Sequence, residues 1–209
     1  MKVLVADDHA VVREGLKRIL TQDHNIEVVA EAEDGSAALA RARELDLDVV
    51  VLDMSMPGRG GLETLQELKR QWPQLGVLVL SMHPEDQYAV RVLREGADGY
   101  LSKESAAEEL ISALRKIHGG GKYVSPTLAE RLALTVERGF EGPPHERLST
   151  REFQVMTLIA QGRTVTDIGD ELHLSVKTIS TYRSRILEKM GMKNNAELMH
   201  YAIEEGIVG

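Results

Sequence analysis

The chain has 209 residues, of which 43% are hydrophobic and 4% aromatic, enough for one large domain or two small ones. It contains no cysteine, which excludes disulfides, thiolate metal sites and thiol nucleophiles. It shows no signal-peptide pattern, and no apolar run approaches the roughly 18 residues of a membrane span. We therefore expect a soluble, cytoplasmic protein that does not engage membranes.

Residues 1–118 alternate strand-like apolar runs with segments of helical spacing. Strands are predicted at 2–6, 26–30, 49–52, 77–80 and 99–101, and helices at 11–20, 35–45, 62–71, 85–95 and 105–117. Five successive strand–helix units predict an α/β domain with a doubly wound, five-stranded parallel sheet. The common strand order for such a sheet is 2-1-3-4-5, with helices on both faces.

Polar residues follow four of these predicted strands. Asp7 and Asp8 end the first, Asp53 the third, Ser81 the fourth and Lys103 the fifth. Ligands of doubly wound sheets bind beyond the carboxyl ends of the strands, and the first and third strands are neighbours in the expected order. The three carboxylates should therefore converge and repel one another unless a cation joins them. Oxygen ligands of this kind favour Mg²⁺.

This arrangement fits a nucleophilic Asp53 that accepts a phosphoryl group. Each residue also has a structural interpretation of its own. Asp7 and Asp8 are typical helix caps, Ser81 is a typical turn residue, and Lys103 is compatible with a solvated surface lysine. Their shared position at strand ends favours a common site.

The motifs DDH at 7–9, LDMSMPG at 52–58, LS at 80–81 and GYLSK at 99–103 resemble the receiver domain of bacterial two-component response regulators. The resemblance implies a flavodoxin-like fold in which Asp53 is phosphorylated. It implies Mg²⁺ ligation by Asp7, Asp8, Asp53 and the backbone carbonyl of Ser55. The residues that sense the phosphoryl group would be Ser81, Tyr100 and Lys103. The side chains of Ser55 and His83 would tune the lifetime of the phosphorylated state. Apart from the resemblance, Tyr100 is compatible with a half-buried residue at the sheet edge.

Residues 119–146 are predicted to link two domains. Three consecutive glycines at 119–121 indicate a flexible exit from the first domain. Ser125 and Pro126 then resemble a helix start, and the apolar spacing predicts a short helix through residue 137. The domain limits we expect are 1–118, 119–146 and 147–209.

Residues 147–209 are predicted to form four helices and no strands. A capping box at Ser149 and Glu152 opens the first, and Ser175 caps a third helix at 176–190. The second and third helices are joined by a short turn, which indicates a helix-turn-helix. Residues 175–193 carry five Lys and Arg against one Glu, although residues 146–209 as a whole carry 8 against 9. Basic charge concentrated on one helix favours DNA binding over a merely solvated surface.

The stretch from Leu148 to Leu198 resembles the LuxR-type helix-turn-helix that follows receivers in the NarL/FixJ subfamily. On that resemblance Ser180, Thr181 and Ser184 face base edges. The candidates for phosphate contact are Lys177, Thr178, Tyr182, Arg183 and Lys189. Arg185 is equally compatible with an internal pair with Glu152. The sequence departs from the family pattern at Gly169, where Ala is usual and helix propensity is higher, at Tyr182, and at Asn194-Asn195.

We therefore expect a transcription regulator rather than an enzyme. A sensor histidine kinase would phosphorylate Asp53, and the active form would dimerise and bind double-stranded promoter DNA. A haloacid dehalogenase-like phosphatase is the rival interpretation, but its nucleophile would end the first strand, with a second Asp two residues later. A constitutive DNA binder with a vestigial receiver is a third, and the intact set of Asp8, Asp53, Ser81 and Lys103 argues against it.

Overall fold

The computed structural model describes residues 1–57, 60–82, 85–130 and 143–208. The chain divides into two compact units, Met1–Arg131 and Leu132–Gly209, each with its own buried apolar residues. The division falls inside the segment predicted as a linker. Within the described residues, no helix has the length and apolar content needed to cross a bilayer.

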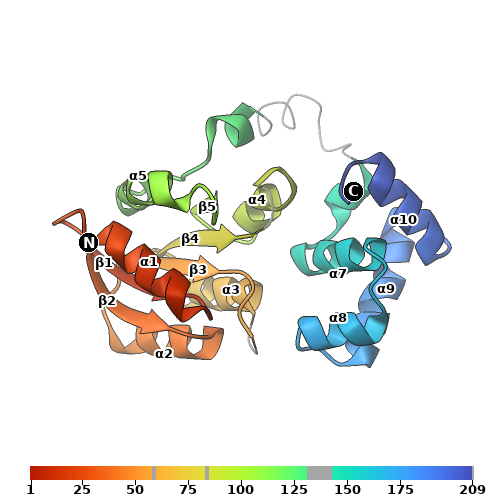
Figure 1. The fold of residues 1–209 in the computed structure, drawn as a ribbon, viewed down its shortest axis with the longest axis horizontal. Coiled ribbons are helices and arrows are strands. Elements are labelled where there is room, and N and C mark those ends of the chain that lie inside the picture. The colour runs from red at the N-terminus through yellow and green to blue at the C-terminus, as the bar shows by residue number, and fades with distance from the viewer. Residues whose placement is uncertain (58–59, 83–84, 131–142, 209) are drawn as a thin grey trace. The chain divides into compact units, whose positions relative to one another are not determined.

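The amino-terminal unit is built on a five-stranded parallel sheet (Figure 1). Its strands are β1 (Lys2–Ala6), β2 (Glu27–Ala32), β3 (Val49–Asp53), β4 (Gly76–Ser81) and β5 (Gly99–Ser102). Their order, β2-β1-β3-β4-β5, confirms the predicted topology. All residues of β3 and β4 are buried, because helices cover both faces of the sheet.

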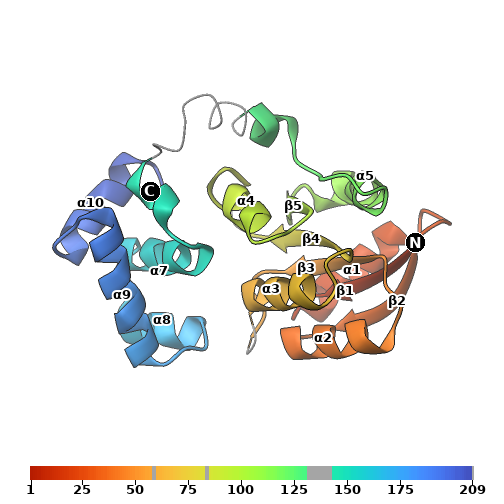
Figure 2. The same ribbon diagram turned by 180° about the vertical axis from the view of Figure 1, so that it is seen from behind.

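Two helices cover one face of the sheet and three cover the other (Figures 1 and 2). On the first face are α1 (Ala10–Leu20) and α5 (Ala106–His118); on the second are α2 (Gly35–Glu44), α3 (Gly61–Gln71) and α4 (Glu85–Arg94). Val3 and Val5 of β1 join Leu16 of α1 and Leu114 of α5 in one apolar core. This core fixes the sheet edge at which the predicted site residues emerge.

The chain leaves α5 through a hydrogen-bonded segment, at the three glycines for which the sequence predicted a flexible exit. The backbone amides of these glycines donate hydrogen bonds to the last carbonyls of α5, so the run terminates that helix. Tyr123 then forms a parallel bridge with Gly99 of β5, and Lys122 lies 3.2 Å from a carboxylate oxygen of Asp98. The Tyr123 hydroxyl also donates to Glu109. Residues 126–130 are helical, and the remainder of the helix predicted to residue 137 lies outside the described residues.

The carboxyl-terminal unit is helical. It contains a 3₁₀ turn, η1 (Pro144–Arg147), and the helices α7 (Thr150–Ala160), α8 (Val165–Glu171), α9 (Val176–Met190) and α10 (Asn195–Glu204). The predicted capping box at Ser149 and Glu152 is present, and the Ser175 side chain caps α9. Helix α7 packs against α9 and α10, and Phe153 and Ile186 are among the buried residues that it brings together. The four predicted helices are confirmed; η1 was not predicted.

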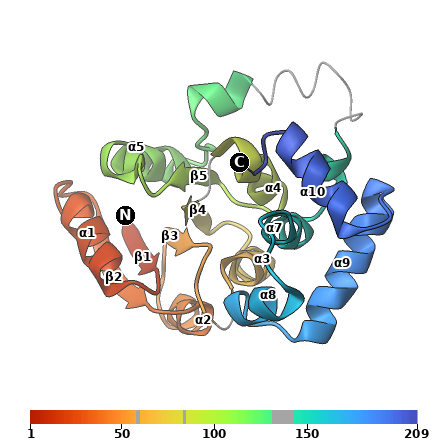
Figure 3. The ribbon, with the colours of Figure 1, turned by 45° about the vertical axis from the view of Figure 1, so that its right-hand side comes forward.

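Helices α8 and α9 meet at a tight turn (Figure 3). The Leu174 amide donates a 2.8 Å hydrogen bond to the carbonyl of Gly169, and His173 has a left-handed φ of 54°. A Cβ on Gly169 would lie only 2.8 Å from the carbonyl oxygen of Leu174. The lack of a side chain at position 169 therefore allows the backbone at Leu174 to lie close to α8. Helix propensity alone does not predict this role of Gly169.

Candidate functional site

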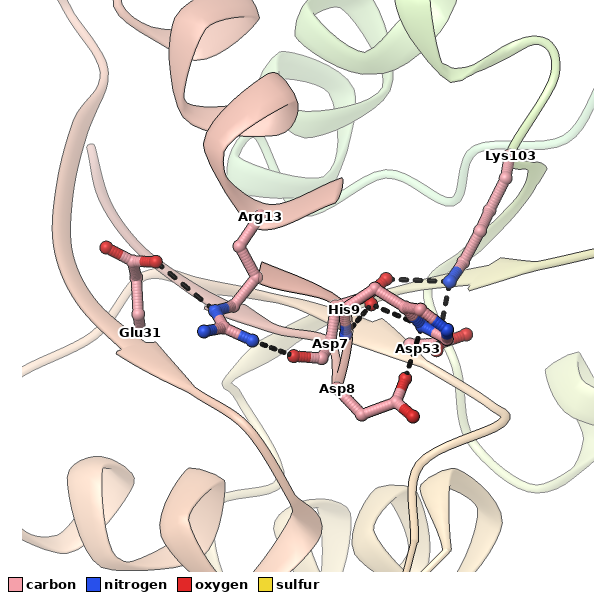
Figure 4. A network of polar contacts seen from close by, with 7 residues as sticks. All are labelled: Asp7, Asp8, His9, Arg13, Glu31, Asp53 and Lys103. Atoms are coloured by element: carbon pink, nitrogen blue, oxygen red, sulfur yellow. Dashed lines mark hydrogen bonds and ion pairs between the residues drawn. The ribbon is translucent and has the colours of Figure 1, made fainter. Parts of the chain in front are cut away.

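Three acidic side chains meet at the carboxyl edge of the sheet (Figure 4). Asp7 and Asp8 follow β1, and Asp53 is the last residue of the adjacent strand β3. Each offers a carboxylate oxygen, and these oxygens and a ring nitrogen of His9 lie within 4.8 Å of one another. Adjacent parallel strands that end together therefore build the cluster from distant parts of the sequence.

Lys103 enters the same cluster from the end of β5. Its Nζ donates a 2.7 Å hydrogen bond to Asp7 and lies 3.0 Å from an oxygen of Asp53. Burial alone lowers the pKa of Lys103, but the hydrogen bond to Asp7 and the charges of both carboxylates raise this pKa above its ordinary value. Lys103 is therefore firmly protonated and partly neutralises the two acids.

Asp53 is fully buried. Burial raises its pKa above the ordinary value, and the charge of Lys103 offsets this effect only in part. Within the described part of the chain, both Asp53 oxygens and one Asp8 oxygen are buried without a hydrogen bond of regular geometry, although one Asp53 oxygen lies 3.0 Å from Lys103 Nζ and the Asp8 oxygen lies 2.7 Å from the His9 ring. One lysine does not neutralise three carboxylates, and a hard divalent cation is a partner that such oxygens fit. The donor set suits Mg²⁺.

The loop after β1 holds the first acid in place (Figure 4). One oxygen of Asp7 accepts a 2.8 Å hydrogen bond from the His9 amide, and the Asp7 carbonyl accepts one from Arg13. Arg13 in turn pairs with Glu31. The exposed His9 ring lies 2.7 Å from an Asp8 oxygen, closer to the acids than a simple surface histidine would be.

The other predicted receiver residues occupy neighbouring positions. Ser81, at the end of β4, is buried next to β3 and β5. Tyr100 is fully buried in β5, in contrast to the half-buried residue of the structural interpretation. Ser55 is exposed in the loop after β3. His83 lies outside the described residues.

Gly61 contributes to this site but was not predicted. It begins α3 and lies against the backbone of Asp53 and Met54, where a Cβ would overlap the Asp53 carbonyl oxygen. The lack of a side chain at position 61 lets α3 approach the end of β3. The GRGG string at 58–61 was the only signal, and it is equally typical of an ordinary loop.

The second candidate site is the surface of α9. The Ser180, Thr181 and Ser184 side chains, which were predicted to face bases, are exposed, and each hydroxyl donates to a carbonyl one turn earlier. Lys177 is also exposed, whereas Thr178, Tyr182 and Arg183 are partly buried. Arg183 donates a 2.6 Å hydrogen bond to Asn195. Asn194 caps α10, so the Asn pair has a structural role in this chain.

The partner of Glu152 is Lys189, not Arg185. Lys189 Nζ lies 2.6 Å from a Glu152 oxygen, and Arg185 is exposed on α9. Burial raises the pKa of Glu152, but the hydrogen bonds from Lys189 and from Ser149 outweigh burial and lower the pKa below its ordinary value. The alternative in which Arg185 pairs internally is therefore wrong.

The family assignment rests on comparisons with known proteins. The family model described as the response regulator receiver domain matches residues 3–115, more than half of the chain. The chain belongs to the response regulator family. The model for bacterial regulatory proteins of the luxR family matches residues 146–202 of this response regulator, in agreement with the expected domain pair.

Relatives of similar length carry the same assignment. The response regulator GacA from Pseudomonas aeruginosa is 41% identical over 209 residues, which cover 100% of this chain and 98% of GacA. The response regulator UvrY from Escherichia coli is 39% identical over 208 residues, which cover 99% of this chain and 95% of UvrY. The likeness therefore extends over both domains of this response regulator.

Solved structures of the response regulator RcsB are also similar. An RcsB–DNA complex matches with a TM-score of 0.70 and 31% identity, covering 96% of this chain and 97% of that chain. RcsB from Salmonella enterica serovar Typhimurium, bound to the promoter rprA with the phosphomimetic BeF3⁻, gives a TM-score of 0.69 and 33% identity over the same shares. The fold predicted for this response regulator, a doubly wound receiver and a helical LuxR-type domain, is thereby confirmed.

Proposed function

We propose that phosphorylation of Asp53 switches this response regulator and that the phosphorylated form binds promoter DNA to regulate transcription. The observation that carries the proposal is the Asp53 carboxylate. It is buried at the end of β3, lacks well-directed hydrogen bonds and lies 3.0 Å from Lys103. A carboxylate held in this way keeps oxygen lone pairs for nucleophilic attack and has a cation beside it that would pair with an incoming phosphoryl group.

In the proposed reaction an Asp53 oxygen attacks the phosphorus of a phosphohistidine on a sensor histidine kinase. The new P–O bond forms as the P–N bond breaks, and the imidazole leaves. Because Asp53 is fully covered, the donor reaches it only after the covering side chains move. The phosphoryl group stays on the chain and no separate substrate is turned over, so this protein acts as a regulator rather than as an enzyme. It would act in the cytoplasm.

Asp8 and Asp53 would hold Mg²⁺ through the oxygens that lack directed hydrogen bonds, together with the Ser55 backbone carbonyl. Asp7 would join them through lone pairs that its two hydrogen bonds leave free, while it keeps Lys103 in place. When bound, the ion supplies charge neutralisation and coordination for phosphoryl oxygens.

Phosphorylation adds charge close to three residues that can respond to it. Lys103 would pair with one phosphoryl oxygen, and the Ser81 hydroxyl would donate to another. Movement of Ser81 would favour the buried position that Tyr100 occupies in this structure. The modification thereby shifts the population of receiver states toward the active one.

The active form would dimerise and place two copies of α9 on paired half-sites of double-stranded DNA. Ser180, Thr181 and Ser184 would read base edges, with Lys177, Thr178, Tyr182 and Arg183 on phosphates. The RcsB structures support this part of the proposal, since they include a DNA complex and a structure of two dimers bound to two parallel DNAs.

Intact-protein mass spectrometry tests the switch. The chain is incubated with a small phosphodonor, with and without Mg²⁺, beside the variant Asp53→Asn. We expect one Mg²⁺-dependent phosphoryl adduct that the variant does not form. An adduct that persists in Asp53→Asn, or the absence of any adduct in the wild type, would refute the mechanism.

A DNA-binding assay tests the output. The phosphorylated wild type should bind its promoter DNA more tightly than the untreated protein, and Asp53→Asn should not respond to the phosphodonor. Equal affinities for all three samples would show that DNA binding does not depend on phosphorylation of the receiver. That result would support the alternative of a constitutive DNA binder.

A further inference from the structure

The basic residues of α9 differ in how firmly the rest of the protein holds them. Lys189 is paired with Glu152, and Arg183 with Asn195. The side chains of Lys177 and Arg185, in contrast, are exposed and form no hydrogen bond or ion pair within the described residues. These two cations would therefore bind an external anion without first giving up a partner in the protein.

These two cations border one hollow on α9. The hollow has a volume of about 260 Å³, and its lining consists of Lys177, Thr178, Thr181, Tyr182 and Arg185. At about 100° per residue, positions 177, 181 and 185 lie on one face of the helix, and 178 and 182 lie beside them. The lining thus combines two cations and a phenol, which are able to donate hydrogen bonds to phosphate oxygens, with two aliphatic hydroxyls. Of these hydroxyls, that of Thr181 already donates to the Lys177 carbonyl.

The hollow also lies in the right place for DNA backbone. It includes Thr181, which is one of the three side chains proposed to read bases, and it continues from there toward Arg185. A helix in the major groove contacts bases with one stripe and phosphates with the adjacent one. Glu188, the only acid on α9, lies three residues beyond Arg185 and forms no ion pair with it in the structure.

We propose that Lys177 and Arg185 form a DNA phosphate-binding notch together with Thr178 and Tyr182, and that Lys189 has a structural role in the domain. The assignment rests on the proposed DNA-binding function. It removes Lys189 from the candidates for phosphate contact and adds Arg185, for which the sequence had left an internal pair with Glu152 open. Arg185 is well suited to the task, since its planar guanidinium binds phosphate oxygens in pairs.

The test compares two substitutions that remove the same charge from the same helix. Arg185→Gln and Lys189→Gln are made in the full chain, and every sample is treated with the phosphodonor and Mg²⁺. Binding to a random-sequence 30-base-pair duplex is then measured by fluorescence anisotropy between 50 and 200 mM KCl. Each phosphate contact adds about 0.9 to the steepness of log K against log salt concentration. We expect Arg185→Gln to reduce this slope by about one and to weaken binding roughly three- to tenfold at 50 mM KCl.

Lys189→Gln should leave the slope unchanged and instead lower the thermal stability of the carboxyl-terminal unit. Lys177→Gln provides a second variant at the notch and should behave as Arg185→Gln does. An unchanged slope in Arg185→Gln, or a loss of about one unit in Lys189→Gln, would overturn the assignment. A phosphorylated wild-type chain that binds no duplex at 50 mM KCl would instead overturn the DNA-binding function.

Discussion

The raised pKa of Asp53 predicts that its ionised carboxylate destabilises the receiver when no metal ion is bound, even with Lys103 beside it. Its folded pKa is raised, so the ionised form is disfavoured in the folded state. Asp53→Asn should therefore increase the free energy of unfolding at pH 7 in EDTA by about 1–2 kcal/mol. The gain should shrink as the pH falls and Asp53 takes up a proton. Denaturant titration followed by Trp72 fluorescence measures it, and a variant less stable than wild type at pH 7 contradicts it.

Glu152 titrates in the opposite sense. Its folded pKa lies below the ordinary value of 4.5, so its ion pair with Lys189 stabilises the fold above that pH. This contribution should disappear as the pH falls through the lowered folded pKa. Methyl NMR of Met156 in the full chain measures the stability of the carboxyl-terminal unit. The loss of stability at low pH should be smaller in Glu152→Gln than in the wild type. An equal loss in both would exclude Glu152 as the cause.

At the residue scale, the sequence predicted which side chains meet at the sheet edge but not every partnership. Asp7, Asp53 and Lys103 were predictable because each directly follows an apolar strand. Lys189 and Arg185 were not distinguishable, since both are basic residues on one amphipathic helix. Small differences in helix packing decide which of them reaches Glu152, and periodicity does not resolve such differences.

The turn between α8 and α9 gives a prediction at the element scale. Helix propensity alone favours Gly→Ala inside a helix by about 1 kcal/mol. In α8, however, Gly169→Ala would crowd the Leu174 carbonyl at 2.8 Å and should destabilise the carboxyl-terminal unit by about 1–3 kcal/mol. The change should appear in the same methyl NMR experiment.

Gly15 is the matched control for this substitution. It lies within α1, and its Cβ would meet no atom within 4 Å apart from its chain neighbours and the backbone of its own helix. Gly15→Ala should therefore stabilise the receiver by about 1 kcal/mol. Stabilisation by both substitutions would show that the turn yields easily and that Gly169 is only a weak helix former.

Elements with strong apolar patterns were predicted well, and the misses have physical causes. The central strands β3 and β4 read as continuous apolar runs because they are buried on both faces. The edge strand β2 is only partly buried and carries Glu27 and Glu31, so its predicted limits of 26–30 differ from the observed Glu27–Ala32. The turn η1 has too few residues to show a period.

The two compact units of the whole molecule should respond separately to metal. Mg²⁺ binds only the folded receiver in the proposed mechanism, so it should raise the receiver transition alone in calorimetry. The gain is about 2.7 kcal/mol at 100 times the dissociation constant. Asp8→Asn should abolish the shift. Equal displacement of both transitions, or a shift that survives in Asp8→Asn, would place the metal elsewhere.

The bridge between Tyr123 and Gly99 also bears on whether a second chain can pair with the edge of the sheet. Strand β5 ends the sheet, and an open edge is a template for pairing with a second chain. Tyr123 occupies part of that edge, and the Lys122 contact with Asp98 holds it there. The residues just after α5 therefore cover part of the edge at which a second chain could pair. A receiver fragment cut at residue 118 should expose this edge and associate more readily than one that extends to residue 130.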